Sequence, residues 1–108
     1  MTSPVIRIAE LEIDPVHLDR YRALLAEEIE ASVAIEPGVL FLHAVSLTGS
    51  PHVIRILEGY PDQSAYEAHL GTPHFLKYKM KTSSMILSLR LLPADALALH
   101  AREGVQLT

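Results

Sequence analysis

Prolines and glycines divide this chain into an ordered set of segments, and that order restricts the fold more than any other feature. Asp14-Pro15 joins a helix-capping side chain to a proline suited to the first helical position. Glu36-Pro37-Gly38 ends that helix, and Thr48-Gly49-Ser50-Pro51 is a turn sequence. Pro61-Asp62 begins a second helix. The order is therefore strand, helix, strand, strand, helix, strand.

The spacing of apolar residues predicts the individual elements. Strands are expected over residues 5–13, 39–47, 52–60 and 85–92, which are rich in β-branched residues. The first helix is amphipathic, and the residues expected on its buried side are Leu18, Tyr21, Leu25, Ile29 and Val33. The second helix runs to Gly71, Thr72-Pro73 opens a further helical turn, and Pro93 is expected to end the last strand. A helix-competent stretch follows over 94–102.

This order predicts an α+β fold, the ferredoxin-like split β-α-β (βαββαβ) with an antiparallel sheet. We expect a single domain over residues 1–108, with its core in 5–92. Helices cover one sheet face, yet residues 39–42 and 53–57 do not alternate cleanly between apolar and polar. Such runs are typical of strands buried on both faces. We therefore expect a homodimer whose second copy covers the other face, with the 93–108 tail packing on the dimer.

Composition excludes several classes of protein. The net charge of −4 argues against nucleic-acid binding, and the absence of cysteine excludes disulfides and thiolate chemistry. No signal peptide or membrane-crossing run is recognised, so a cytoplasmic protein without membrane contacts is expected. Lys77, Lys79, Lys81 and Arg90 lie in a stretch without acids. This stretch is either a solvated face or an electropositive rim for an anionic substrate.

Three motifs resemble the antibiotic biosynthesis monooxygenase family: Glu36-Pro37-Gly38 before an apolar strand, Glu58-Gly59-Tyr60, and Ala65-x-x-x-His69-x-x-Thr72-Pro73-His74-Phe75. The resemblance covers about residues 5–92. It implies a dimeric α/β barrel with one pocket per subunit between sheet and helices. Some relatives oxygenate anthrone- or quinol-like compounds with molecular oxygen and without metal or flavin. Others isomerise a phosphorylated autoinducer-2 derivative. Haem-degrading relatives rely on Trp and Asn, which this chain lacks, and many members have Trp where Tyr60 stands.

Oxygenation without a cofactor requires a substrate anion, so the protein must remove a proton and stabilise the resulting charge. His69 is the first candidate for the proton acceptor, and capping of the helix C-terminus is the alternative. Tyr60 is expected to pack against the substrate ring. Arg55, in an apolar strand, either stabilises the developing anion or pairs with Glu58 or Glu10.

Five further residues are candidates for substrate binding, and each has a structural alternative. Tyrosine and phenylalanine rings suit an aromatic substrate but are equally common in cores. The two histidines could instead form hydrogen bonds across a turn or within the barrel. The candidates are His43, Tyr66, His74, Phe75 and Tyr78.

No cofactor and no metal are expected. His69 and His74 are five residues apart across Gly71 and Pro73, unlike an i, i+4 ligand pair, and glycine-rich nucleotide loops are absent. Three functions stay open: a cofactor-independent monooxygenase for an aromatic or quinol-like compound, an isomerase of a small phosphorylated keto sugar derivative, and a non-catalytic dimeric binder of an apolar metabolite.

Overall fold

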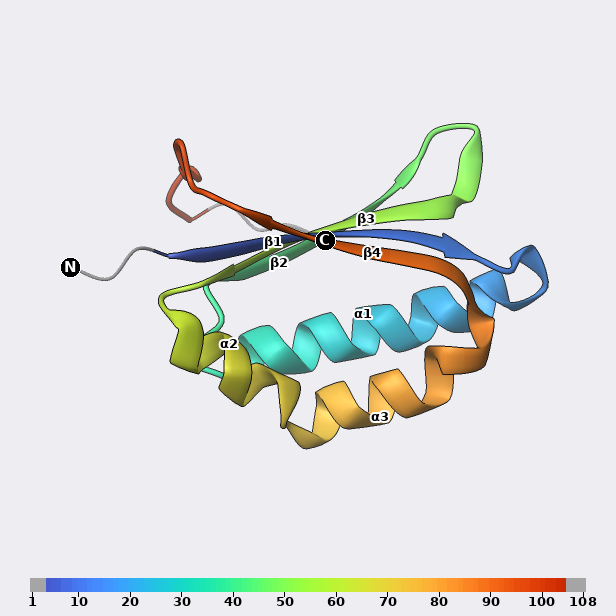
Figure 1. Ribbon diagram of the computed structural model, residues 1–108, viewed down its shortest axis with the longest axis horizontal. Coiled ribbons are helices and arrows are strands. Elements are labelled where there is room, and N and C mark those ends of the chain that lie inside the picture. The colour runs from blue at the N-terminus through green and yellow to red at the C-terminus, as the bar shows by residue number, and fades with distance from the viewer. Residues whose placement is uncertain (1–3, 105–108) are drawn as a thin grey trace.

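The computed structural model describes residues 4–104 and has the predicted order of elements (Figure 1). Its α+β fold is an antiparallel sheet in the order β2-β3-β1-β4, with three α-helices. The strands are β1 (Val5–Ile13), β2 (Phe41–Leu47), β3 (Ser50–Tyr60) and β4 (Ile86–Ala94). The helices are α1 (Leu18–Ile35), α2 (Gln63–Leu70) and α3 (Pro73–Thr82), with 3-10 turns at Pro15–His17 and Ser83–Met85.

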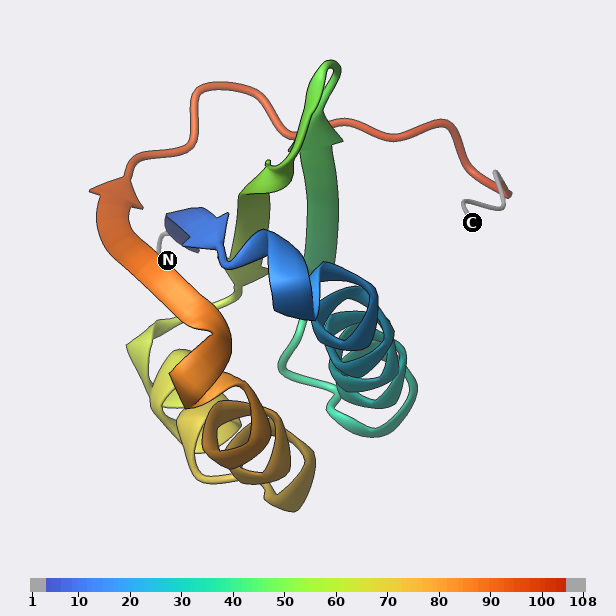
Figure 2. The ribbon, with the colours of Figure 1, turned by 90° about the vertical axis from the view of Figure 1, so that its right-hand side faces the viewer.

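All three helices lie on one side of the sheet, which we call the inner face (Figures 1 and 2). The main core lies between this face and α1, where Ile13 and Tyr21 are fully buried. Alternation places Ala9 and Leu11 of β1 on the inner face with Ile54 and Ile56 of β3, and all of these belong to the same core. Among the residues described, no helix is long and apolar enough to cross a membrane.

The helix signals hold, with local differences. Asp14 accepts a hydrogen bond from the Val16 amide, but the first turn is 3-10 and the α-helix proper begins at Leu18. Val33, expected on the buried side, is 53% exposed. The buried stripe instead passes through Leu24, Glu28 and Ser32, because 3.6 residues per turn carry the stripe past Val33.

The C-terminal third differs most from expectation. The turn expected at Thr72-Pro73 is a full ten-residue helix, α3. Pro93 does not end the last strand, since β4 runs to Ala94 with Pro93 paired to Arg7. A proline is tolerated there because β4 is an edge strand.

The segment after β4 is not helical within residues 95–104, although residues 94–102 are helix-competent in sequence. Figures 1 and 2 show it on the side of the sheet away from the helices. Leu97 is fully exposed and Leu99 is 42% exposed, so this chain alone does not cover them. The predicted packing of the tail on a dimer stays a prediction, and residues 105–108 lie outside the described range.

The second side of the sheet, which we call the outer face, mixes apolar and charged residues. Val45 and Leu47 of β2 are 59% and 43% exposed. Arg55 and Arg90 both form ion pairs with Glu10, at 3.2 and 2.9 Å, across three neighbouring strands. The outer face therefore carries exposed apolar side chains on β2 and a row of ion-paired side chains across β3, β1 and β4.

Candidate functional site

A cavity of about 570 Å³ lies between the inner face and the helices. Its walls are mainly apolar, and its polar groups include Glu28, Glu58 and His69. Leu87, Leu89 and Leu91 of β4 also line it although they are 52–60% exposed, so the cavity is open along this edge. A concave apolar space with a few polar groups is the usual form of a small-molecule site.

His69 is buried on the wall of this cavity, with 2% of its surface exposed. The Asp62 side chain caps α2 by accepting from the Ala65 amide, and the helix carries His69 in its last turn. The Nδ1 atom of His69 lies 2.9 Å from Glu36 Oε2, and its Nε2 atom lies 3.6 Å from Glu28 Oε1. The ring thus interacts with two carboxylates from α1 and the loop after it.

Glu36 joins His69 to His74. Its Oε2 atom is also 2.5 Å from His74 Nε2, so one carboxylate oxygen contacts both imidazoles. Burial acts to raise the pKa of Glu36, but the hydrogen bonds from His74 and His69 outweigh it and lower the pKa below its ordinary value. Glu36 is therefore a carboxylate that orients two rings. His74 does not line the cavity.

Tyr60 is completely buried and does not line the cavity itself. Its hydroxyl donates to Glu58 Oε1 at 2.6 Å, and Glu58 is on the cavity wall. Burial raises the pKa of Glu58 above its ordinary value, although the hydrogen bond from Tyr60 acts against this. Tyr60 also lies against His69, with ring centroids 5.5 Å apart.

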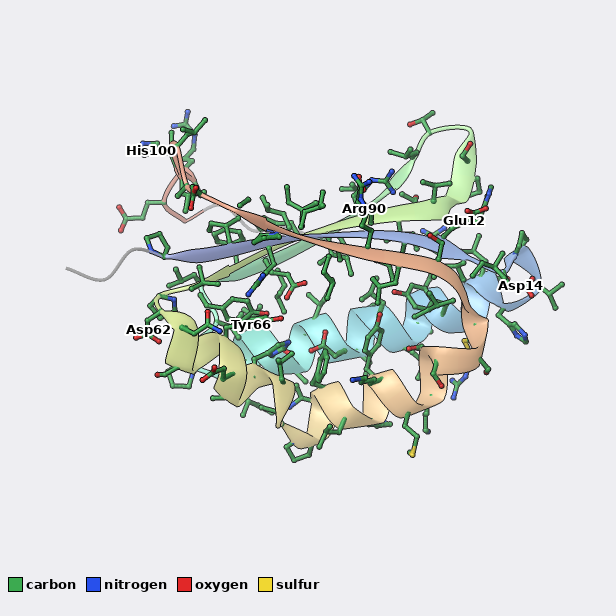
Figure 3. All side chains as sticks on the ribbon, in the orientation of Figure 1. Glu12, Asp14, Asp62, Tyr66, Arg90 and His100 are labelled. Atoms are coloured by element: carbon green, nitrogen blue, oxygen red, sulfur yellow. The ribbon has the colours of Figure 1, made fainter. Side chains whose placement is uncertain are left out.

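Three of the predicted substrate-binding rings do line the cavity: Tyr66, Phe75 and Tyr78. Figure 3 shows Tyr66 pointing into the space between α2 and the sheet, and its ring packs under the Arg7 guanidinium. The Tyr78 hydroxyl is 2.7 Å from that of Tyr21, and burial raises the pKa of both tyrosines. The ring centroids of Phe75 and His69 are 5.0 Å apart.

Arg55 and His43 are on the outer face, away from the cavity. Arg55 pairs with Glu10, the structural alternative considered above, and His43 is exposed and stacks on Phe41 at 5.2 Å. Figure 3 shows Arg90, the second partner of Glu10, pointing away from the helices. The strands place these side chains opposite the inward residues, because alternate residues face opposite sides.

Two acids in the cavity wall were not among the predicted site residues. Glu28 lies in the buried stripe of α1, seven residues after Tyr21, and accepts from Ser32 Oγ at 2.6 Å. Glu58 alternates with Ile54, Ile56 and Tyr60, which are buried. Both positions follow from the sequence when the helical or strand spacing of the buried residues is extended to charged residues as well as apolar ones.

Glu28, His69 and His74 form one group within residues 4–104 that could hold a metal ion, since their possible ligand atoms lie within 4.8 Å of one another. The spacing argument against a metal therefore fails, because the break at Gly71 brings the two histidines together. The same side chains already form a hydrogen-bonded network with Glu36 and Ser32.

Comparison with known proteins identifies the family and the fold. The sequence profile of the antibiotic biosynthesis monooxygenase family matches residues 4–81. The chain belongs to this family. A protein from Bacteriodes thetaiotaomicron VPI-5482, named a putative antibiotic biosynthesis monooxygenase, is 42% identical, with a TM-score of 0.88 over 98% of this chain and 97% of its own. No curated protein matches the chain.

Two solved structures of lower identity have a similar fold. PA3566 from Pseudomonas aeruginosa is 23% identical, with a TM-score of 0.82 over 91% of this chain and 98% of its own. Rv0793 from Mycobacterium tuberculosis is 23% identical, with a TM-score of 0.81 over 92% of this chain and 100% of its own. At this level of identity the two likenesses show the fold alone.

Proposed function

We propose that this protein is a cofactor-independent monooxygenase that oxidises a small aromatic or quinol-like compound with molecular oxygen. The observation that carries the proposal is His69, buried on the wall of an apolar cavity with its Nδ1 atom held by Glu36. In the neutral ring Nδ1–H donates to Glu36, and Nε2 keeps a lone pair to accept a substrate proton. The anion left on the substrate is the species that can react with oxygen.

The charges around the cavity favour this function over the isomerisation of a phosphorylated sugar. Two of the cavity's polar groups are carboxylic acids, Glu28 and Glu58, and Lys79 is the basic residue in its wall. Lys77 pairs with Glu27 outside the cavity, and Arg90 pairs with Glu10 on the outer face. A phosphate would therefore meet two carboxyl side chains, with Lys79 as the one lysine that residues 4–104 place in the cavity wall. A buried histidine and two acids also argue against a purely passive apolar binder.

The test is oxygen uptake with a panel of quinols and anthrones, using protein dialysed against a chelator. General-base catalysis contributes roughly 10²–10⁴-fold, so His69→Ala is expected to lower turnover by about that factor. His17→Ala is the control, because His17 is exposed outside the cavity. Circular dichroism checks that both variants are folded. Equal turnover by His69→Ala and wild type, or loss of activity on chelation, would contradict the proposal.

We also propose a homodimer in which a second copy covers the outer face. Val45 and Leu47 there are largely exposed in the single chain. A stable interface of this kind buries more than about 1,200 Å² in total. Sedimentation at micromolar concentration tests this, and Val45→Asp is expected to shift the protein towards monomer. The cytoplasmic location stays a prediction that cell fractionation would check.

A further inference from the structure

Glu58 is an acidic residue on the inner face of the sheet, in the wall of the cavity. It lies on β3 between inward-facing Ile56 and Tyr60, and its neighbours across the sheet are Arg7 and Leu42. It lines the same cavity as His69. A carboxyl at such a position is costly to bury unless it is paired, protonated or used.

The two carboxyl oxygens of Glu58 differ in their contacts. Oε1 accepts the hydroxyl proton of Tyr60 at 2.6 Å, and within residues 4–104 Oε2 has no hydrogen bond. Tyr60 is fully buried and does not reach the cavity, so it acts on a substrate only through Glu58. The fixed Oε1 leaves Oε2 as the atom free to meet a bound molecule.

Four ionisable groups act on Glu58, one from its own strand β3 and one each from α1, α2 and β1. Burial, the largest influence, raises its pKa, and the charge of Glu28 on α1 adds to this. The Tyr60 hydrogen bond, the charge of His69 on α2 and the charge of Arg7 on β1 act in the opposite direction but do not cancel it. Burial therefore lets Glu58 hold a proton more readily than an exposed glutamate does.

We propose that Glu58 is the acid partner of His69 and donates a hydrogen bond from Oε2–H to the substrate oxygen on which negative charge develops. This inference rests on the proposed function. His69 Nε2 takes a proton from a substrate O–H or C–H, and the electron pair left behind forms a phenolate or enolate. Glu58 keeps its proton and stabilises that oxygen. The substrate class is then a neutral compound whose acidic hydrogen lies near a hydroxyl or carbonyl oxygen.

The first experiment needs no substrate. The side-chain carboxyl carbons of glutamate are labelled with ¹³C, and the Glu58 signal is assigned by its loss in Glu58→Gln. In the wild type this signal is expected to titrate above the ordinary value of 4.5, and that of exposed Glu67 serves as the reference. A Glu58 midpoint at or below 4.5 would overturn the proposal.

The second experiment uses 4-nitrophenol, whose absorption changes when it loses its proton. The wild type is expected to bind the dye as the phenolate, with the proton on His69. Glu58→Ala should weaken this binding roughly 10- to 100-fold, since a hydrogen bond to a charged group is lost. The affinity of Glu58→Gln for the dye should lie between those of the wild type and Glu58→Ala, because its amide N–H still donates. The affinity of Glu67→Gln should match that of the wild type. Unchanged binding by Glu58→Ala, or binding of only the neutral dye by wild type, would refute the acid role.

Oxygen uptake separates this inference from the proposed function. If both hold, Glu58→Ala lowers kcat by about 10²–10³-fold, and wild-type kcat falls as rising pH removes the Glu58 proton. That alkaline fall should be absent in Glu58→Gln. A protein that binds the phenolate through Glu58 but consumes no oxygen would refute the monooxygenase alone. Oxygen uptake that is indifferent to Glu58 would refute the acid role alone.

Discussion

The inner face of the sheet pairs ionisable groups between different elements, whereas the outer face pairs them within the sheet. On the inner side, Glu36 follows α1 and contacts His69 of α2 and His74 of α3. On the outer side, Glu10, Arg55 and Arg90 come from three adjacent strands and keep part of their surface in solvent. The first arrangement depends on the tertiary fold and lowers the pKa of Glu36. The second follows from the register of the strands.

The comparison also shows why a charged residue in an apolar strand is an ambiguous signal. Arg55 and Glu58 are both such residues of β3, three positions apart. An odd separation places them on opposite faces, so Glu58 lines the cavity and Arg55 does not. Whether a charged side chain of β3 reaches the cavity depends on which face it points to. That face alternates from one residue of the strand to the next.

The largest expected effect comes from the inner core. Ile13→Ala removes a fully buried side chain and should lower the free energy of unfolding by about 2–5 kcal/mol. Val33→Ala, at a half-exposed position on α1, is the control and should change it by no more than about 0.5 kcal/mol. Urea unfolding measures both. Similar losses in the two variants would mean that α1 is oriented differently.

Removing the shared carboxylate should have the next largest effect. Glu36→Gln weakens two hydrogen bonds to histidine and should cost about 1.5–3 kcal/mol at neutral pH. The folded-state pKa of Glu36 is lowered, so its contribution is complete above the ordinary value of 4.5 and is lost as pH falls through the lower folded-state value. The difference between wild type and variant should therefore shrink in acid. Glu30→Gln, at an exposed position, should show neither effect.

On the outer face, close packing around Gly59 should contribute more to stability than the ion pairs do. A Cβ atom at Gly59 would lie 2.4 Å from atoms of the Phe41 ring, so Gly59→Ala is expected to cost about 1–3 kcal/mol. The double variant Gly59→Ala/Phe41→Leu should recover part of that loss by making space. Thermal unfolding would test the pair, and an additive double variant would count against direct contact.

The smallest effect is expected for the outer ion pairs. Arg55→Gln should cost only about 0.2–1 kcal/mol, less in high salt, because its pair with Glu10 is partly exposed. Turnover should not change, since the side chain faces away from the cavity. A large fall in turnover with unchanged stability would make Arg55 a functional residue after all.

The sequence predicted the fold well because its signals are local. Asp14 and Asp62 mark helix starts and make the expected capping hydrogen bonds. Thr72, at the start expected from Thr72-Pro73, also caps its helix by accepting from the Phe75 amide. The site was predicted less completely. The positions of Glu28 and Glu36 beside His69 depend on how α1 packs against α2 and α3, which no local pattern contains.

The short link between α2 and α3 sets the relative directions of His69 and His74. The number of residues in this link therefore matters independently of which residues they are. On one continuous helix, His69 and His74 would point about 140° apart. The end of α2 at Leu70 and the restart of α3 at Pro73 instead bring both rings to the same oxygen of Glu36. Inserting or deleting one residue within 70–73 would rotate α3 relative to α2 and separate the rings without replacing any site residue. We therefore expect evolution to vary the side chains of this link more freely than its number of residues.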